Sequence, residues 1–333
     1  MMENYNKIFV TRNSYEYKFK MLQKYKGKFV KKRYFIWNIE STKCWKCQKN
    51  VKNGFNENNQ WIQIILKVYE NDWYKHDDLA NCFTSNIRKK SKRYDEPLSQ
   101  SEYEIKKKND IVNTMKKRGM SYEDALYSCV RGVNNFRPTV MIAIIKKLFK
   151  EHEKIRILDP CGGWGDRLIA SMSLNVREYI AFDINKELIP KYEEITEYFK
   201  NLSSTKTSFI CEPFEKTDVK LLGEFDVVFT SPPFYNLEIY FGVEFNYKSL
   251  KEWKEKFLYP FTLNCCQSLK RNGYLILNIN SIRKGNKSED LICLLMDAIK
   301  RTKELKYCGV ISFAKFYGNK FKSPQPVWIW QKI

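Results

Sequence analysis

The sequence predicts an α/β protein in which a seven-stranded, mostly parallel sheet fills the second half of the chain and a smaller basic region precedes it. Three observations support this prediction: strand and helix patterns alternate from about residue 131 onward, a glycine-rich turn follows the first of those strands, and positive charge is concentrated before residue 151. Such alternation is typical of parallel sheets that helices cover on both faces. We therefore expect residues 1–98 to form the basic region, residues 99–130 a helical linker and residues 131–333 the α/β domain.

Helical patterns lead into the predicted sheet. Ser121 is placed to cap one helix, because serine is favoured at the N-cap and Asp124 follows three residues later. Pro138 is placed to begin the next helix, since proline suits the first helical position and apolar residues follow it at helical spacing. The chain is thus expected to enter its first strand from a helix.

The elements of the sheet follow in chain order. Apolar runs predict strands, and apolar residues that recur with the period of a helix predict the segments between them. The expected strands are "IRILDP", "EYIAFDI", "TSFIC", "FDVVFT", "GYLILNIN", "CGVISFA" and "PVWIWQK". The expected helices are "DRLIASMSL", "KELIPKYEEITEYFK", "KEWKEKFLYPFTLNCCQSLK" and "EDLICLLMDAI". In the basic region only "WIQIILKVY" predicts a strand.

The charge of the chain points to a polyanionic partner. The formal net charge is +21; residues 1–150 hold 32 Lys and Arg against 15 Asp and Glu, whereas residues 151–333 hold 27 against 23. An AT-rich coding sequence would spread its lysines evenly, so the asymmetry favours a phosphate-contacting N-terminal region. The chain lacks a long apolar run and a signal-peptide pattern, from which we expect a soluble intracellular protein. We expect most cysteines, as in "LICLL", to be reduced.

A possible metal site lies in the basic region. Cys44 and Cys47 have zinc-knuckle spacing, and His76 and Cys82 could complete a tetrahedral Cys3His site. One such cysteine pair followed by a long gap has low specificity, however. Reduced cysteines beside an aromatic core explain the same residues, so both interpretations stay open.

The turn "LDPCGGWGDR" is the first candidate for ligand binding. In open α/β sheets, ligands bind beyond the carboxyl ends of the strands, where small residues let the backbone approach them. Gly162, Gly163 and Gly165 allow this approach, and Asp159 at the strand end can accept hydrogen bonds from a ligand. Asp183 ends the next strand at a spacing that suits the two hydroxyls of a ribose. Together these residues indicate a nucleoside cofactor.

The stretch "TSPPFY" follows the fourth strand of the domain and is expected at the same edge of the sheet. Its two prolines fix the backbone and remove N–H donors, which leaves the carbonyls of Ser231 and Pro232 as rigid acceptors. Phe234 supplies a flat face for stacking. A donor-poor niche beside an aromatic ring suits the exocyclic amino group of a nucleobase. The alternative is a strand that ends in proline, with the aromatic ring in the core.

These motifs resemble the Rossmann-like, class I S-adenosylmethionine-dependent methyltransferases, and specifically the amino-methyltransferases of DNA and RNA bases. The resemblance covers residues 131–333 and implies a seven-stranded methyltransferase sheet. It implies a catalytic motif at Ser231, Pro232, Pro233 and Phe234. It implies cofactor contacts from Phe136, Arg137, Thr139, Asp159, Cys161, Gly162, Gly163, Gly165, Asp183 and Glu212, with Glu215 as a competitor for the role of Glu212 near the adenine.

The activity that the resemblance implies is methylation of a base amino group in DNA, at cytosine N4 or adenine N6. Serine at the first motif position is commoner in cytosine-N4 enzymes. The chain after Phe234 leaves no room for a large recognition insert, so residues 1 to about 130 are expected to contact the nucleic acid. Methylation of an RNA base or of a protein glutamine amide stays open, as does a nucleic-acid-binding protein whose methyltransferase domain no longer reacts.

Overall fold

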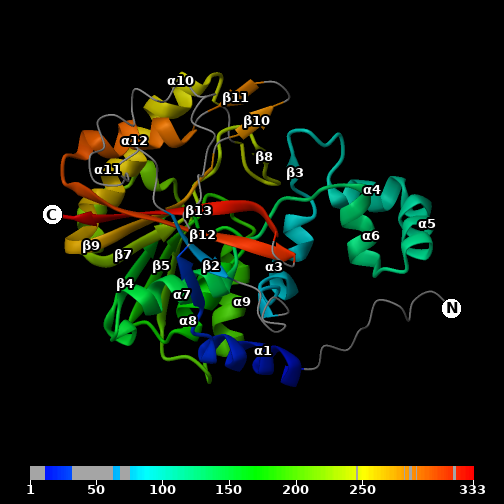
Figure 1. Cartoon of the computed structure of the whole chain (residues 1–333), viewed down its shortest axis with the longest axis horizontal. Helices are drawn as coiled ribbons and strands as arrows, with labels where there is room; N and C mark the ends of the chain where they lie inside the picture. Colours follow the sequence, from blue (N-terminus) through cyan, green and yellow to red (C-terminus); the bar gives the residue numbers. More distant parts are fainter. Residues whose placement is uncertain are drawn as a thin grey trace.

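The computed structural model describes residues 12–31, 63–67, 76–244, 247–280, 282–284, 287–289, 291–317 and 320–333 (Figure 1). Its α-helices are α1 (Arg12–Lys24), α3 (Asn81–Arg88), α4 (Gln100–Lys106), α5 (Lys108–Arg118), α6 (Tyr122–Cys129), α7 (Pro138–Leu148), α8 (Asp166–Ser173), α9 (Ile189–Phe199), α10 (Leu250–Trp253), α11 (Tyr259–Gln267) and α12 (Leu291–Thr302). Short 3-10 segments are η3 (His152–Lys154), η4 (Phe214–Lys216) and η5 (Val219–Leu222), and the π-helical turn η6 (Lys254–Leu258) joins α10 to α11.

The strands are β1 (Lys28–Lys31), β2 (Gln63–Lys67), β3 (Lys92–Arg93), β4 (Arg156–Asp159), β5 (Glu178–Phe182), β6 (Lys206–Ile210), β7 (Phe225–Thr230), β8 (Glu238–Ile239), β9 (Leu269–Asn278), β10 (Ile282–Lys284), β11 (Lys287–Glu289), β12 (Leu305–Tyr317) and β13 (Lys320–Lys332). The main sheet has the order β1-β2-β12-β13-β9-β7-β4-β5-β6. Strands β6, β5, β4, β7 and β9 run parallel, whereas β13 is antiparallel to both neighbours. The seven predicted strands are all present, which confirms the α/β, Rossmann-like fold.

Two apolar cores lie on opposite faces of this sheet, because successive strand residues point to opposite sides. Ile157 on β4 packs in the core under α1, α3, α7, α8 and α9, and its neighbour Leu158 packs in the core under α11 and α12. Figure 1 shows α10, α11 and α12 on one side of the sheet and α1, α7, α8 and α9 on the other. The parallel strands are therefore covered on both faces, and their carboxyl ends meet at one edge.

The described part of the N-terminal region joins this body. Phe19 and Leu22 on α1 and Phe83 on α3 are buried in the same core as α7 and α8. Strands β1 and β2 lengthen the sheet, since β2 pairs in parallel with β12. The predicted strand "WIQIILKVY" thus contains β2, while β1 and its pairing were not predicted.

Helices α4, α5 and α6 form a small helical unit that projects beside the sheet (Figure 1). Ile111, Ala125, Leu126 and Val130 make a separate buried cluster within it. Ser121 caps α6 by accepting from the Asp124 N–H, and Pro138 is the first residue of α7, both as predicted. The unit is connected to the body through β3, which pairs with β8 after the proline motif.

The cysteines and the helix lengths bear on two further expectations. Seven of the described cysteines are free thiols, but Cys293 in "LICLL" is disulfide-bonded, so the expectation of a reduced thiol is wrong at this position. Within the described ranges, none of the helices combines the length and the apolar character that a membrane crossing requires.

Candidate active site

A cavity of about 760 Å³ opens at the carboxyl edge of the parallel strands. The glycine turn after β4, the acid after β5, the segment after β6 and the proline motif after β7 all contribute to its lining. Of the fourteen predicted catalytic and cofactor-binding residues, eleven line it: Phe136, Arg137, Cys161, Gly162, Gly163, Asp183, Glu212, Ser231, Pro232, Pro233 and Phe234. The other three, Thr139, Asp159 and Gly165, are buried and do not contribute to the lining.

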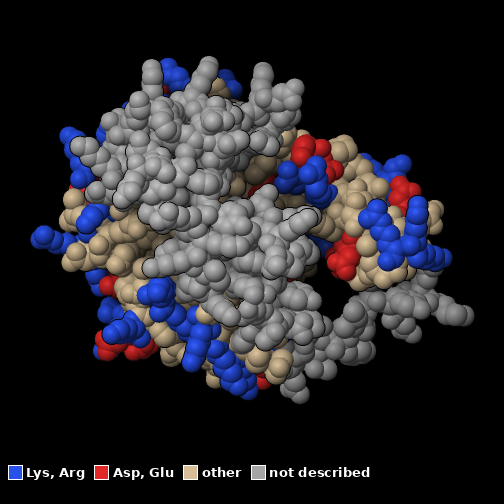
Figure 2. Space-filling model, viewed as in Figure 1, with Lys and Arg blue, Asp and Glu red and all other residues tan. Residues whose placement is uncertain are grey.

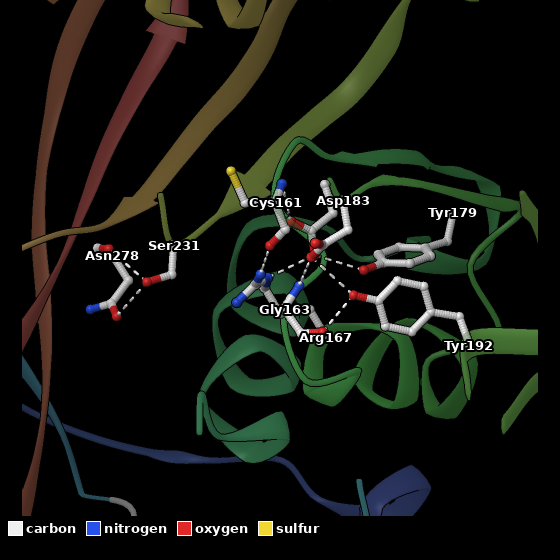
Figure 3. A network of polar contacts seen from close by, with 9 residues as sticks. Cys161, Gly163, Arg167, Tyr179, Asp183, Tyr192, Ser231 and Asn278 are labelled. Carbon is white, nitrogen blue, oxygen red and sulfur yellow. Dashed lines mark hydrogen bonds and ion pairs between the residues drawn. The ribbon is translucent and has the colours of Figure 1, made fainter. Parts of the chain in front are cut away.

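The glycine turn and Asp183 are held together by hydrogen bonds (Figure 3). The Asp183 carboxylate accepts from the Gly163 N–H at 2.9 Å, from the Asn185 N–H at 2.9 Å and from the Tyr192 hydroxyl at 3.1 Å. A carboxylate has about four acceptor positions, so about one remains for a ligand hydroxyl. Gly163 has a positive φ of 62°, a conformation that glycine adopts without strain.

Asp159 supports the turn from beneath instead of facing the cavity. Its side chain is fully buried; it accepts from Arg167 Nε at 2.7 Å, from the Tyr179 hydroxyl at 2.6 Å and from the Cys161 N–H at 3.3 Å. Arg167 in turn donates to the Cys161 carbonyl. These internal donors occupy the carboxylate, so the structure gives Asp159 a supporting place outside the cavity lining, and its contact with a ligand stays a prediction.

The segment before α7 forms a second wall of the cavity. Phe136 and Arg137 line it, and the Phe136 ring lies 5.4 Å from the Arg167 guanidinium. Thr139 instead binds Asp77, which accepts from its N–H at 3.1 Å and its hydroxyl at 2.7 Å. Asp77 thereby supplies a capping acceptor for the start of α7, which Arg137 at the N-cap does not. No sequence pattern had indicated Asp77.

The segment after β6 contributes an apolar side chain and two acids to the cavity lining. Glu212 and Glu215 both line the cavity, and the buried Phe214 ring lies between them in the chain. Glu212 is exposed, whereas burial raises the pKa of Glu215. The competition between these two acids for the role near an adenine therefore stays open.

The proline motif places its polar groups at the cavity wall. Ser231 Oγ lies 3.1 Å from the Asn278 carbonyl and 3.4 Å from Asn278 Oδ1, as Figure 3 shows. Pro232 is buried, and its carbonyl accepts no hydrogen bond within the described part of the chain. Tyr235 has a positive φ of 45°, which is unusual for an aromatic residue, and its N–H donates to the Pro233 carbonyl. The turn is thus strained beside a possible ligand site.

Several lining residues were missed by the sequence analysis because they come from distant segments. Glu238, on β8, accepts from the Tyr240 hydroxyl at 2.7 Å and from the Asn134 N–H at 3.4 Å. The Tyr240 ring lies 6.1 Å from Trp164 in the glycine turn. Arg93 on β3 pairs with Glu238. These residues line the cavity between the glycine turn and the proline motif. Glu238 and Tyr240 follow "TSPPFYN" closely in the sequence, and this is the local signal that could have indicated them.

Burial raises the pKa of several groups in the lining, Asp183 and Glu215 among them. It raises the pKa of Asp166 to about 8, although Arg167 and Arg88 oppose this. It also raises the pKa of Glu238, and it raises that of the Cys161 thiol well above its usual range. Cys161 is therefore a neutral thiol, which does not suit a nucleophile.

The proposed zinc ligands are only partly within the described chain. Cys44 and Cys47 lie outside the described residues. His76 and Cys82 are described, and among the described residues there is no group of three or more His, Cys, Asp or Glu that could hold a metal ion. The zinc site stays a prediction.

Comparison with known proteins finds distant structural likenesses. No protein-family model matches the sequence, and no curated protein is similar to it. A putative class I S-adenosylmethionine-dependent methyltransferase from Listeria monocytogenes has a TM-score of 0.43 at 14% identity over 70% of this chain and 72% of that one. TrmN from Thermus thermophilus has a TM-score of 0.41 at 16% identity over 60% of this chain and about half (49%) of that one. These likenesses are distant and do not identify a substrate.

Proposed function

We propose that the protein is an S-adenosylmethionine-dependent methyltransferase that acts on the exocyclic amino group of a base in DNA, at cytosine N4 or adenine N6. One observation supports this above all: a single cavity joins the glycine turn and Asp183 to Ser231, Pro232 and Phe234. A methyl donor and an amine acceptor must meet for transfer, and this cavity has a place for each.

The residues at one end fit the cofactor. Asp183 has an acceptor position left for a ribose hydroxyl, and Ile184, Leu188 and Phe214 give apolar surface for an adenine. At the far side of the turn, Arg137 brings a positive charge that suits the carboxylate of a methionine, and the Asp166 carboxyl group offers an acceptor for its ammonium. When bound, the cofactor would supply an electrophilic methyl group on sulfur.

The proline motif would position the amine. The Ser231 hydroxyl oxygen and the Pro232 carbonyl accept its two N–H bonds, while the Phe234 ring stacks on the base. An aromatic amine is a weak nucleophile because its lone pair is delocalised into the ring. Acceptors placed out of the ring plane favour a pyramidal nitrogen and so localise that pair. Positioning and electrostatics then provide most of the rate enhancement.

Nucleic acid is the proposed partner, and DNA is placed before RNA. The exposed basic residues of α5 are the proposed contacts for phosphates near a base held in the motif. An RNA base or a protein glutamine amide presents the same N–H bonds, so these remain the alternative substrates. Both would use the same motif.

The test is transfer from labelled S-adenosylmethionine to separate pools of DNA, RNA and protein, followed by mass spectrometry of the modified nucleoside or amino acid. Label in N4-methylcytosine or N6-methyladenine of DNA is expected. Ser231→Ala and Phe234→Ala should each reduce transfer at least about 100-fold, with cofactor affinity within about twofold. Ser268→Ala, which removes a serine hydroxyl bonded to the Asn264 carbonyl outside the cavity, is the matched control. Unchanged transfer in both motif variants would refute the site.

A further inference from the structure

Asn278 holds Ser231 in one hydrogen-bonding orientation. Asn278 is the last residue of β9 and lies opposite Val327 on β13, so its side chain sits where these two strands meet the cavity. Its amide nitrogen donates to the Pro326 carbonyl at 2.8 Å. A carbonyl can only accept, so the amide nitrogen must face Pro326 and the amide oxygen must face Ser231.

The consequence for Ser231 follows from its neighbours. Its oxygen lies 3.1 Å from the Asn278 main-chain carbonyl and 3.4 Å from the Asn278 amide oxygen, both of which are acceptors only. A hydroxyl has one proton to donate and two lone pairs. Because the proton is directed to Asn278, the lone pairs are what Ser231 can offer to the cavity that it lines.

We infer that Asn278 is a positioning residue that makes Ser231 an obligate acceptor, so that the site binds a base bearing an amino group and rejects the matching base bearing a carbonyl oxygen. This inference rests on the proposed function, because it assumes that a base enters beside Ser231. A carbonyl there would face a hydroxyl oxygen whose proton is already committed. Two acceptors would then meet without a proton between them, which is costly in a buried site.

The experiment measures equilibrium binding and needs no methyl transfer. Two pairs of single-stranded DNA oligonucleotides are used, one with cytosine or uracil and one with adenine or hypoxanthine at a single position. S-adenosylhomocysteine is present throughout. In the wild type, the amino member of one pair is expected to bind about 10- to 100-fold more tightly. The pair that shows the difference also identifies the target base.

Variants of Asn278 separate its effect on the orientation of the Ser231 hydroxyl from its effect on the stability of the fold. Asn278→Ala should reduce the amino preference about fivefold, since one acceptor is lost and the main-chain carbonyl remains. Asn278→Asp keeps oxygens for Ser231 but loses the donor to Pro326, so it should keep the preference even if it unfolds at a lower temperature. Asn278→Leu replaces Asn278→Ala if the smaller side chain prevents folding. Ser268→Ala should leave the preference unchanged.

The two proposals fail in different ways. If the wild type discriminates but transfers no methyl group to any pool, the proposed function fails and the role of Asn278 stands. If it transfers but binds amino and carbonyl bases equally, the role of Asn278 is wrong. Equal loss of preference in Asn278→Ala and Asn278→Asp would also overturn it. In a Ser231→Ala background, Asn278→Ala should have no further effect on the preference, and an additive effect would contradict the coupling.

Discussion

The two ends of the cavity are built from different kinds of sequence. The cofactor end is mostly local: residues 159 to 192 supply the glycine turn, Asp183 and Tyr192, and internal hydrogen bonds tie them together. The end at the proline motif combines β3, β8, the end of β9 and Gln325 on β13. The first end therefore depends mainly on the pairing of two strands that are neighbours in the chain, whereas the second end depends on the pairing of distant segments.

The largest effect is expected from a substitution at the cofactor end. Asp183→Ala should weaken S-adenosylmethionine binding about 100-fold or more, because it removes a ligand contact and also leaves the Gly163 N–H and the Asn185 N–H without their acceptor. Isothermal titration calorimetry measures this affinity. Glu187→Ala is the control: it removes an exposed acid four residues further along the chain that does not line the cavity, so we expect a loss of at most about twofold. Similar losses in the two variants would contradict the role of Asp183.

A smaller effect is expected when hydrogen bonds at the proline-motif end are removed. Glu238→Ala removes the acceptor for Tyr240 and Asn134. We expect kcat/KM to fall about tenfold through misplacement of the proline motif, with cofactor affinity preserved. Steady-state kinetics and calorimetry on the same variant separate the two outcomes.

Glu244→Ala, an exposed acid a few residues further along, is the control for loss of negative charge. If Glu238→Ala weakened cofactor binding as much as catalysis, the two ends would not be independent.

The helical unit beside the second end offers a more modest test. Lys116 and Lys117 on α5 are exposed, and Figure 2 shows Lys and Arg side chains over the region of α4, α5 and α6. Lys116→Glu with Lys117→Glu should weaken DNA binding severalfold and reduce the dependence of log K on log salt concentration by about 0.9 for each lost phosphate contact. Lys300→Glu with Lys306→Glu makes the same charge change on exposed residues elsewhere. Equal effects from both pairs would indicate net charge alone.

The same contrast explains what could be predicted from the sequence. The glycine turn, Asp183 and the proline motif each follow a strand in the chain, so apolar periodicity sufficed to bring them to one edge. Glu238 is held at the site by the pairing of β8 with β3, and Asn278 by the pairing of β9 with β7, in which Leu277 lies opposite Thr230. Short polar strands such as β3 have no apolar pattern to indicate a partner.

Even at the cofactor end, the position of a residue in the chain did not show whether its side chain lines the cavity or supports the turn from inside the fold. Asp159 ends its strand as Asp183 follows the next one, yet Asp159 is fully buried and bonded to Arg167 and Tyr179. The difference lies in the neighbours: the arginine at the second position of α8 and a tyrosine on β5 both donate to Asp159. Only the folded arrangement reveals that those donors are directed inward.

The last prediction concerns a buried acid, Asp166, at the cofactor end. Burial raises the pKa of Asp166 to about 8, so in the folded protein it keeps its proton at pH values where the unfolded chain has lost it. Between about pH 4 and 8 the folded state therefore binds more protons, and the free energy of unfolding should fall as pH rises, by up to about 1.4 kcal/mol per pH unit. Asp166→Asn removes this contribution.

Urea unfolding of the wild type and Asp166→Asn at pH 5, 6, 7 and 8 measures the effect. Asp77, whose pKa burial raises to about 7, titrates in both proteins, and its charge also raises the pKa of Asp166, so the difference between the two proteins reports Asp166 together with this coupling. We expect the stability of the variant relative to the wild type to increase with pH. If the two proteins showed parallel curves of stability against pH, Asp166 would already be charged in the folded protein because Arg167 and Arg88 stabilise its negative charge. The cofactor end would then contain an ionic cluster, and our inference of a neutral acid would be wrong.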